Sequence, residues 1–147
     1  MRRYRSPALC AAIVVVALLA TACPSSSDLD RMANASNELA HDVLLANRVV
    51  TEFYTAKKMP IEVKDRIADK LGVIGNKGER FNDSLIALDK KYPQGTLPPQ
   101  DLQFVRDNLA ELRQLYSSVL ADLLPFKAQK AVSSLDKHLD TIEGVVK

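Results

Sequence analysis

The chain has 147 residues, of which 47% are hydrophobic, and a formal net charge of +2. The first 22 residues contain three arginines and no acidic residue, so the rest of the chain holds 17 basic against 18 acidic residues. This balance excludes the strongly basic surface typical of a nucleic-acid-binding protein. Cys23 is the only cysteine after residue 22, which excludes an internal disulfide there. The length of this part suits a single domain.

The first 22 residues have the organisation of an export signal. Arg2, Arg3 and Arg5 form a positively charged start, an apolar segment covers residues 8–20, and small residues end at Ala22. As a helix, this apolar segment would rise only about 20 Å, less than the roughly 30 Å of membrane hydrocarbon. We therefore expect cleavage after Ala22 and no permanent membrane-spanning anchor.

Cys23 directly follows the sequence LLATA. This arrangement resembles the lipobox of bacterial lipoproteins, although Ala20 stands where leucine is usual. The resemblance covers residues 1–25 and implies an exported protein of the bacterial cell envelope, lipid-anchored at Cys23. Pro24, in place of the aspartate associated with inner-membrane retention, favours an outer membrane. The alternative is an ordinary secretory signal followed by an unmodified cysteine.

A short tether, residues 23–27, precedes a single domain that we predict to be all-α over residues 28–147. Its apolar residues recur at alternating steps of three and four, the pattern of helices in a bundle. In the first helix, which is expected to end at Met59-Pro60, these positions are Leu29, Met32, Ser36, Leu39, Val43, Ala46, Val50 and Phe53. In the second, which is expected to begin with Pro60, they are Ile67, Leu71, Ile74, Gly78, Phe81, Leu85, Leu88 and Tyr92.

Prolines and a glycine between residues 93 and 99 predict a loop before the third helix. The apolar positions of that helix are Leu102, Val105, Leu109, Leu112, Tyr116, Val119, Leu123 and Phe126. After Pro125 the spacing shifts, and the apolar positions become Ala128, Val132, Leu135, Leu139, Ile142 and Val146. We therefore predict an antiparallel bundle of three long helices, the third kinked or broken at Pro125, which gives three to four helical segments.

Gly72, Gly75 and Gly78 lie three residues apart within the second predicted helix. Three glycines inside a helix cost about 3 kcal/mol relative to alanine, so a compensating reason is expected. One interpretation is close contact with a neighbouring helix, and another is a local opening into a turn around Asn76. A third is a gap in the bundle that admits a ligand or a partner.

The polar residues offer little for catalysis or metal binding. Glu38 and His41 have the Glu-x-x-His spacing of di-iron bundles, but the apolar pattern predicts that both face solvent. We also expect His138 at the surface, and Asp136 and Asp140 on a solvated helix face. No serine, threonine or lysine has the sequence partners typical of a nucleophile. We predict that the protein is not an enzyme and uses no metal or cofactor.

Leu44 and Leu45 are apolar outside the pattern of the first helix, as are Leu120 and Leu124 in the third. The favoured interpretation is that the other helices surround the first one, and the alternative is an exposed strip for a partner. We predict an envelope lipoprotein whose bundle binds another protein as scaffold, adaptor or inhibitor. Its contact region would comprise Leu44, Leu45 and the three glycines.

Two other functions stay open. A carrier would hold an acyl chain or another apolar ligand where the bundle opens at Gly75. The second is covalent attachment to peptidoglycan through Lys147. The combination of a lipidated cysteine, heptad helices and a final lysine resembles that of the small outer-membrane lipoproteins joined to the cell wall. This chain ends in Val-Val-Lys, where those proteins end in Tyr-Arg-Lys.

Overall fold

A computed structural model describes residues 26–94 and 96–147, and these residues form helices and turns without a β-strand. Four α-helices span Ser26–Thr55 (α1), Ile61–Lys91 (α2), Pro99–Leu123 (α3) and Ser133–Val146 (α4). Two 3-10 turns, Leu124–Phe126 (η1) and Gln129–Val132 (η2), connect α3 to α4. The predicted export signal, its expected cleavage point at Ala22 and Cys23, the residue predicted to be lipidated, lie outside the described residues.

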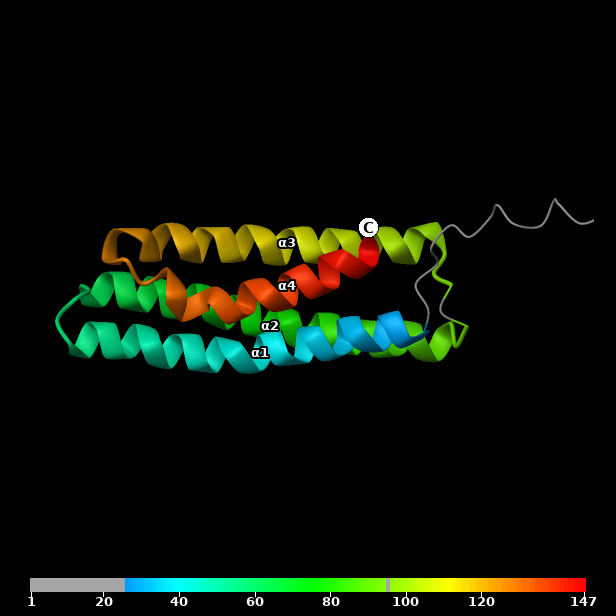
Figure 1. Ribbon diagram of the computed structural model, residues 1–147, viewed down its shortest axis with the longest axis horizontal. Helices are drawn as coiled ribbons and strands as arrows, with labels where there is room; N and C mark the ends of the chain where they lie inside the picture. Colours follow the sequence, from blue (N-terminus) through cyan, green and yellow to red (C-terminus); the bar gives the residue numbers. More distant parts are fainter. Residues whose placement is uncertain (1–25, 95) are drawn as a thin grey trace, which may run out of the picture.

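The four helices run antiparallel to their neighbours in the chain (Figure 1), and their contacts close a ring around one core. α1 packs against α2 and α4, and α3 packs against the same two helices. At 1.5 Å per residue, α1 is about 45 Å long and α4 only about 21 Å. The C-terminus therefore stops short of the end of the bundle at which α1 begins (Figure 1).

The alternating apolar pattern correctly predicts the core. Apart from the partly buried Phe53, Leu102, Tyr92 and Phe126, the residues of the predicted pattern are buried. The largest fully buried side chains are Leu29, Met32, Leu39, Ile67, Leu71, Ile74, Phe81, Leu85, Leu112, Leu123, Leu135 and Leu139. They come from all four helices, so α4 is part of the core and not an extension of α3.

The chain reverses at Pro125, so the predicted break at this proline is confirmed, and the bundle has four helices; a three-helix arrangement is not confirmed. The backbone N–H of Ala128 donates to the Leu123 carbonyl (3.3 Å), and Lys127 adopts a left-handed conformation with φ of 54°. This pattern belongs to the Schellman motif, which ends a helix and turns the chain away from its axis. α4 then returns along α1 and α3 as the fourth helix of the bundle.

The boundaries between α1 and α2 also differ from the prediction. α1 ends at Thr55, before the expected Met59-Pro60. Pro60 is the N-cap of α2, with φ of −66° and ψ of 154°, and not its first helical residue. Its carbonyl accepts the first bond of the helix from the N–H of Lys64 (3.1 Å).

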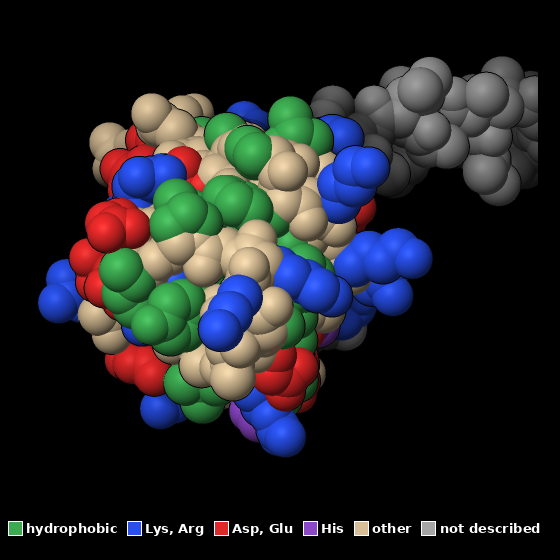
Figure 2. Space-filling model, turned by 90° about the vertical axis from the view of Figure 1, so that its left-hand side faces the viewer, with side chains coloured by type: hydrophobic (Ala, Val, Ile, Leu, Met, Phe, Trp, Pro, Cys, Tyr) green, Lys and Arg blue, Asp and Glu red, His purple; other side chains and the backbone are tan. Residues whose placement is uncertain are grey.

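The α1–α2 turn and the α3–α4 connection lie at the same end of the bundle, opposite the start of α1 (Figure 1). Figure 2 shows the molecule from this end. Apolar side chains lie between basic ones on the end face, and acidic side chains lie towards its edges (Figure 2).

Candidate functional site

Leu44 and Leu45 are exposed near the middle of α1, with 67% and 50% of their surface accessible. The favoured interpretation, that other helices surround α1, is therefore wrong. Leu124 is 62% exposed at the end of the bundle, whereas Leu120 is partly buried and packs against the core. The surplus of apolar residues noted in the sequence thus lies largely on the surface.

Leu44 lies on the side of α1 that faces α2. It follows Ala40 by four positions, and residues four apart share one face of a helix. A Cβ on Gly78 of α2 would lie 3.8 Å from the Ala40 Cβ, which places this face against α2. Gly72 is exposed on α2, and a Cβ there would meet nothing within 4 Å.

Gly75 and Gly78 lie at the contact between α1 and α2. A Cβ on Gly78 would lie 3.0 Å from Leu39 Cδ2, and one on Gly75 would lie 3.4 Å from Val43 Cγ1. The fully buried hydroxyl of Ser36 donates to the Gly78 carbonyl at 2.8 Å. Close helix contact is therefore confirmed for these two glycines. The predicted opening of the helix around residue 76 is wrong, because α2 is continuous there.

Leu45 points about 100° away from Leu44 around the helix axis, on the part of the exposed face of α1 nearer to α4. It follows Asp42 by three positions, and Asp42 Oδ2 lies 3.1 Å from Nε2 of His138 in α4. The expectation that His138 lies on the surface is wrong, since this pair is part-buried between two helices. Glu38 and His41 are exposed, as the apolar pattern predicts. Of the predicted contact residues, Leu44, Leu45 and Gly72 are exposed, whereas Gly78 is buried.

An ionic cluster between α3 and α4 was not anticipated from the sequence. The guanidinium of Arg113 donates to Asp136 Oδ1 (2.7 Å), to Glu143 Oε2 (2.9 Å) and to Asp140. Burial lowers the pKa of Arg113, but its hydrogen bonds with the three carboxylates outweigh burial and raise that pKa overall. Asp136 and Asp140 thus bind a neighbouring helix and do not form the purely solvated face that was expected.

The three carboxylates lie at spacings of four and three residues, which places them on one face of α4. This spacing was the signal in the sequence that could have indicated an acidic cluster. The partner could not be read from it, because Arg113 precedes the nearest carboxylate by 23 residues. Lys147, the residue considered for wall attachment, is exposed, and its Nζ lies 2.8 Å from Glu143 Oε1.

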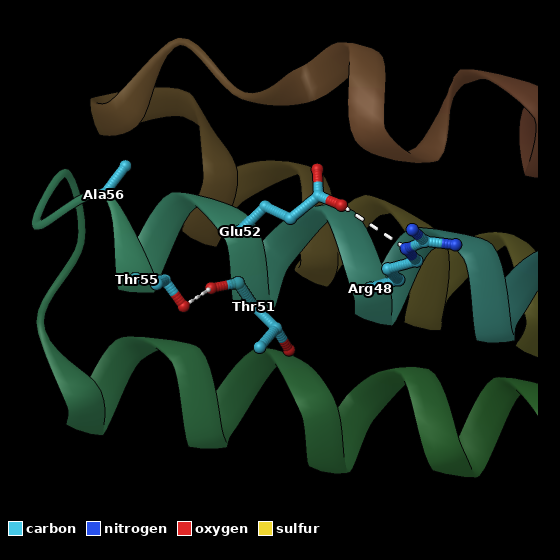
Figure 3. Close-up of a pocket in the computed structure, with 5 residues that line it drawn as sticks. All are labelled: Arg48, Thr51, Glu52, Thr55 and Ala56. Carbon is cyan, nitrogen blue, oxygen red and sulfur yellow. Dashed lines mark hydrogen bonds and ion pairs between the residues drawn. The ribbon is translucent and has the colours of Figure 1, made fainter.

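A shallow depression follows the last turns of α1 and is lined by Arg48, Thr51, Glu52, Thr55 and Ala56 (Figure 3). Arg48 Nε lies 3.4 Å from Glu52 Oε1, and the Thr55 hydroxyl donates to the Thr51 carbonyl at 2.9 Å (Figure 3). These polar groups bond to each other within α1, so the depression has the character of an ordinary helix surface. A second hollow lies at the α1–α2 turn, lined by residues 54–55 and 57–61.

Within the part of the chain that the structure describes, no group of three or more His, Cys, Asp or Glu side chains could hold a metal ion. None of the helices described there has the length and apolar character needed to cross a membrane. Neither a protein-family model, nor a curated protein, nor a solved structure matches this chain.

Proposed function

We propose that this chain is a lipid-anchored, non-enzymatic lipoprotein of the bacterial cell envelope whose helical bundle binds another protein as scaffold, adaptor or inhibitor. The observation that carries the proposal is the exposure of Leu44 and Leu45 near the middle of α1. Burying one such side chain contributes about 1.5–3 kcal/mol, so each leucine offers substantial binding energy to a partner. Because the two leucine side chains point in different directions from α1, a partner would contact either one of them or both.

The proposed anchor determines how the bundle would sit at a membrane. α1 begins three residues after Cys23, and three residues extend at most about 11 Å. An acylated Cys23 would therefore keep the start of α1 close to the lipid surface. Leu44 would lie about 27 Å further along the helix, within reach of a protein in the adjacent compartment.

The carrier has less support than the interaction module. It requires an opening at Gly75, but α2 is continuous there and a Cβ on Gly75 would already be in contact with Val43. Attachment to peptidoglycan through Lys147 is supported only by the exposure of its side chain.

The test is purification of the tagged protein from its own host in mild detergent, followed by mass spectrometry of its N-terminus and of the proteins that elute with it. Leu44→Asp and Leu45→Asp are examined separately, because the two side chains face different neighbours. Val73→Asp is the matched control, since Val73 is another exposed apolar residue of the bundle, on α2.

Acyl mass on Cys23, together with a stoichiometric protein that is lost from one leucine variant and kept in the Val73 control, supports the proposal. An unmodified N-terminus contradicts the lipid anchor. A bait without a protein partner that carries extractable apolar mass would instead support the carrier.

A further inference from the structure

The end of the bundle opposite the start of α1 consists of two turns, residues 54–62 and 124–131, which we call the distal pole (Figure 1). The pole contains four lysines and one glutamate, a formal charge of +3. The other residues from position 26 onward contain 13 basic and 17 acidic residues, a formal charge of −4. Positive charge is thus concentrated at one end of an otherwise acidic domain.

Helix dipoles do not explain this concentration. α1 and α3 end at the distal pole, whereas α2 and α4 begin there (Figure 1). The partial charges of the two helix C-termini and the two helix N-termini therefore largely cancel. The lysines face no net negative helix dipole.

Three of the four lysines of the pole are available for an external partner. Within the described residues, Lys57, Lys127 and Lys130 take part in no ion pair or cation–π contact. Lys58 Nζ lies over the ring of Phe53, 5.7 Å from its centroid. Of the carboxylates near the pole, Asp122 is occupied by Lys70 (2.5 Å) and Arg66 (3.2 Å) of α2.

Two of the lysines occupy strained backbone positions. Lys57 has φ of 56° and Lys127 has φ of 54°, and each is the left-handed residue of a Schellman motif that ends a helix. Glycine is the usual residue at such a position, because a side chain is disfavoured there. Each of the two turns therefore carries a positive charge where local backbone geometry alone favours glycine.

The same pole exposes large apolar side chains. Tyr54 and Ile61 are exposed in the first turn, and Leu124 is exposed in the second. Figure 2 shows apolar and basic side chains intermixed on this face. Exposed apolar groups among lysines are the combination by which proteins bind to the surface of anionic membranes.

We propose that the distal pole docks on an anionic phospholipid surface. Anionic headgroups complement its charge, and the boundary of the acyl chains accepts the exposed apolar side chains. A fluid surface contacts two separate protruding turns at once, without the matched shape that a protein partner would need. Combined with the proposed anchor at the other end, docking would let the bundle bridge two membranes about 45 Å apart. The bridging rests on the proposed function, but the docking does not.

The test is a vesicle-tethering assay with the full chain. The protein is reconstituted into dense, sucrose-loaded phosphatidylcholine vesicles, and it captures fluorescent acceptor vesicles that sediment with them. Acceptors are pure phosphatidylcholine or equal parts of phosphatidylcholine and phosphatidylglycerol. The chain inserts through acyl chains on Cys23. Where N-terminal mass spectrometry finds an unmodified Cys23, its thiol is instead coupled to a maleimide-bearing lipid of the dense vesicles, because Cys23 is the only cysteine after residue 22. A failure of the proposed lipidation is therefore reported separately and leaves the capture assay intact.

Lys57→Gly combined with Lys127→Gly is the decisive variant, because glycine suits both backbone positions and the fold is retained. Each lysine near an anionic surface contributes about fivefold in affinity, so we expect about thirtyfold weaker capture. Lys90→Gln combined with Lys137→Gln is the matched control, since it removes the same charge from exposed positions outside the pole. Leu124→Gln tests the apolar contribution at an exposed position.

We expect capture of anionic acceptors only, with capture reduced in the pole variants and unchanged in the control. Raising NaCl from about 0.1 M to about 1 M shortens the Debye length from about 10 Å to about 3 Å and should abolish capture. Equal capture of neutral acceptors would overturn the proposal, as would equal losses in the pole and control variants. No capture at low salt would also overturn it and would point to an acidic protein as the partner of the pole.

Discussion

Gly72 and Gly78 of α2 differ only in their surroundings. Gly72 is exposed in the helix interior, so alanine should raise the free energy of unfolding by about 1 kcal/mol by restricting the unfolded chain. Alanine at Gly78 would lie 3.0 Å from Leu39 Cδ2 and crowd the contact between α1 and α2. Overpacking costs about 1–3 kcal/mol, so Gly78→Ala should lower the free energy of unfolding by about 1 kcal/mol.

Urea unfolding of the two variants measures this difference directly. Each variant adds one methyl group to the same helix, so each serves as the control for the other. Equal stabilisation by both substitutions would contradict the close contact at Gly78. The Ser36 hydrogen bond to the Gly78 carbonyl provides a second probe of the same contact, since Ser36→Ala should cost about 1 kcal/mol.

Lys57 and Lys127 should both be suboptimal for stability. A left-handed conformation costs a residue with a side chain about 1–2 kcal/mol, and glycine avoids most of this cost. We expect Lys57→Gly and Lys127→Gly each to raise the free energy of unfolding by about 0.5–1 kcal/mol, as measured by urea unfolding. Substitution of Lys130 by glycine is the control and should not stabilise, because Lys130 lies in a 3-10 turn and is not a positive-φ residue.

At the scale of elements, ion pairs join neighbouring helices, and one of them predicts how stability depends on pH. Burial acts to raise the pKa of Asp122 in α3, but hydrogen bonds from Lys70 and Arg66 of α2 outweigh burial and lower that pKa below 3.8. A carboxylate with a lowered folded-state pKa stabilises the fold above its unfolded pKa. That stabilisation is lost as the pH falls through the folded-state value.

Asp122→Asn should therefore lower Tm at neutral pH, and the difference from the parent should shrink as the pH falls below about 4. Thermal unfolding followed by circular dichroism between neutral and acidic pH measures this difference. Asp69→Asn, at an exposed position on the same pair of helices, is the control. A difference that stays constant down to about pH 2 would contradict the role assigned to the Asp122 carboxylate.

The elements differ in how far the sequence predicted them. The core positions of the helices were predictable, because the spacing of apolar residues within a helix is a local property. The break at Pro125 was also predictable, because proline interrupts a helix. The turn itself was not, since the residue that turns the chain is Lys127 and not the glycine that signals such a turn. The exposure of Leu44 and Leu45 and the contacts of Arg113 depend on which helices become neighbours. That arrangement is a tertiary property, and the spacing of apolar residues within one helix does not determine it.

At the scale of the whole molecule, the fourth helix decides whether the fold is stable. In a three-helix bundle with a kinked extension, residues 124–147 would be dispensable. In the observed ring, α4 and the preceding turn bury five large aliphatic side chains against the other helices: Val132, Leu135, Leu139, Ile142 and Val146. At about 1.5–3 kcal/mol each, their burial contributes about 8–15 kcal/mol, close to the whole stability of a typical domain.

Truncation after Leu123 should therefore abolish cooperative unfolding and expose the core faces of α1 and α3. We expect strong binding of a hydrophobic fluorescent dye and a thermal transition without a sharp midpoint. Removal of only Val146 and Lys147 is the control, and it should keep a cooperative transition with a lower Tm, because one of the five side chains is lost. A truncated chain that unfolds cooperatively would mean that three helices suffice, and α4 would then be an accessory to the bundle.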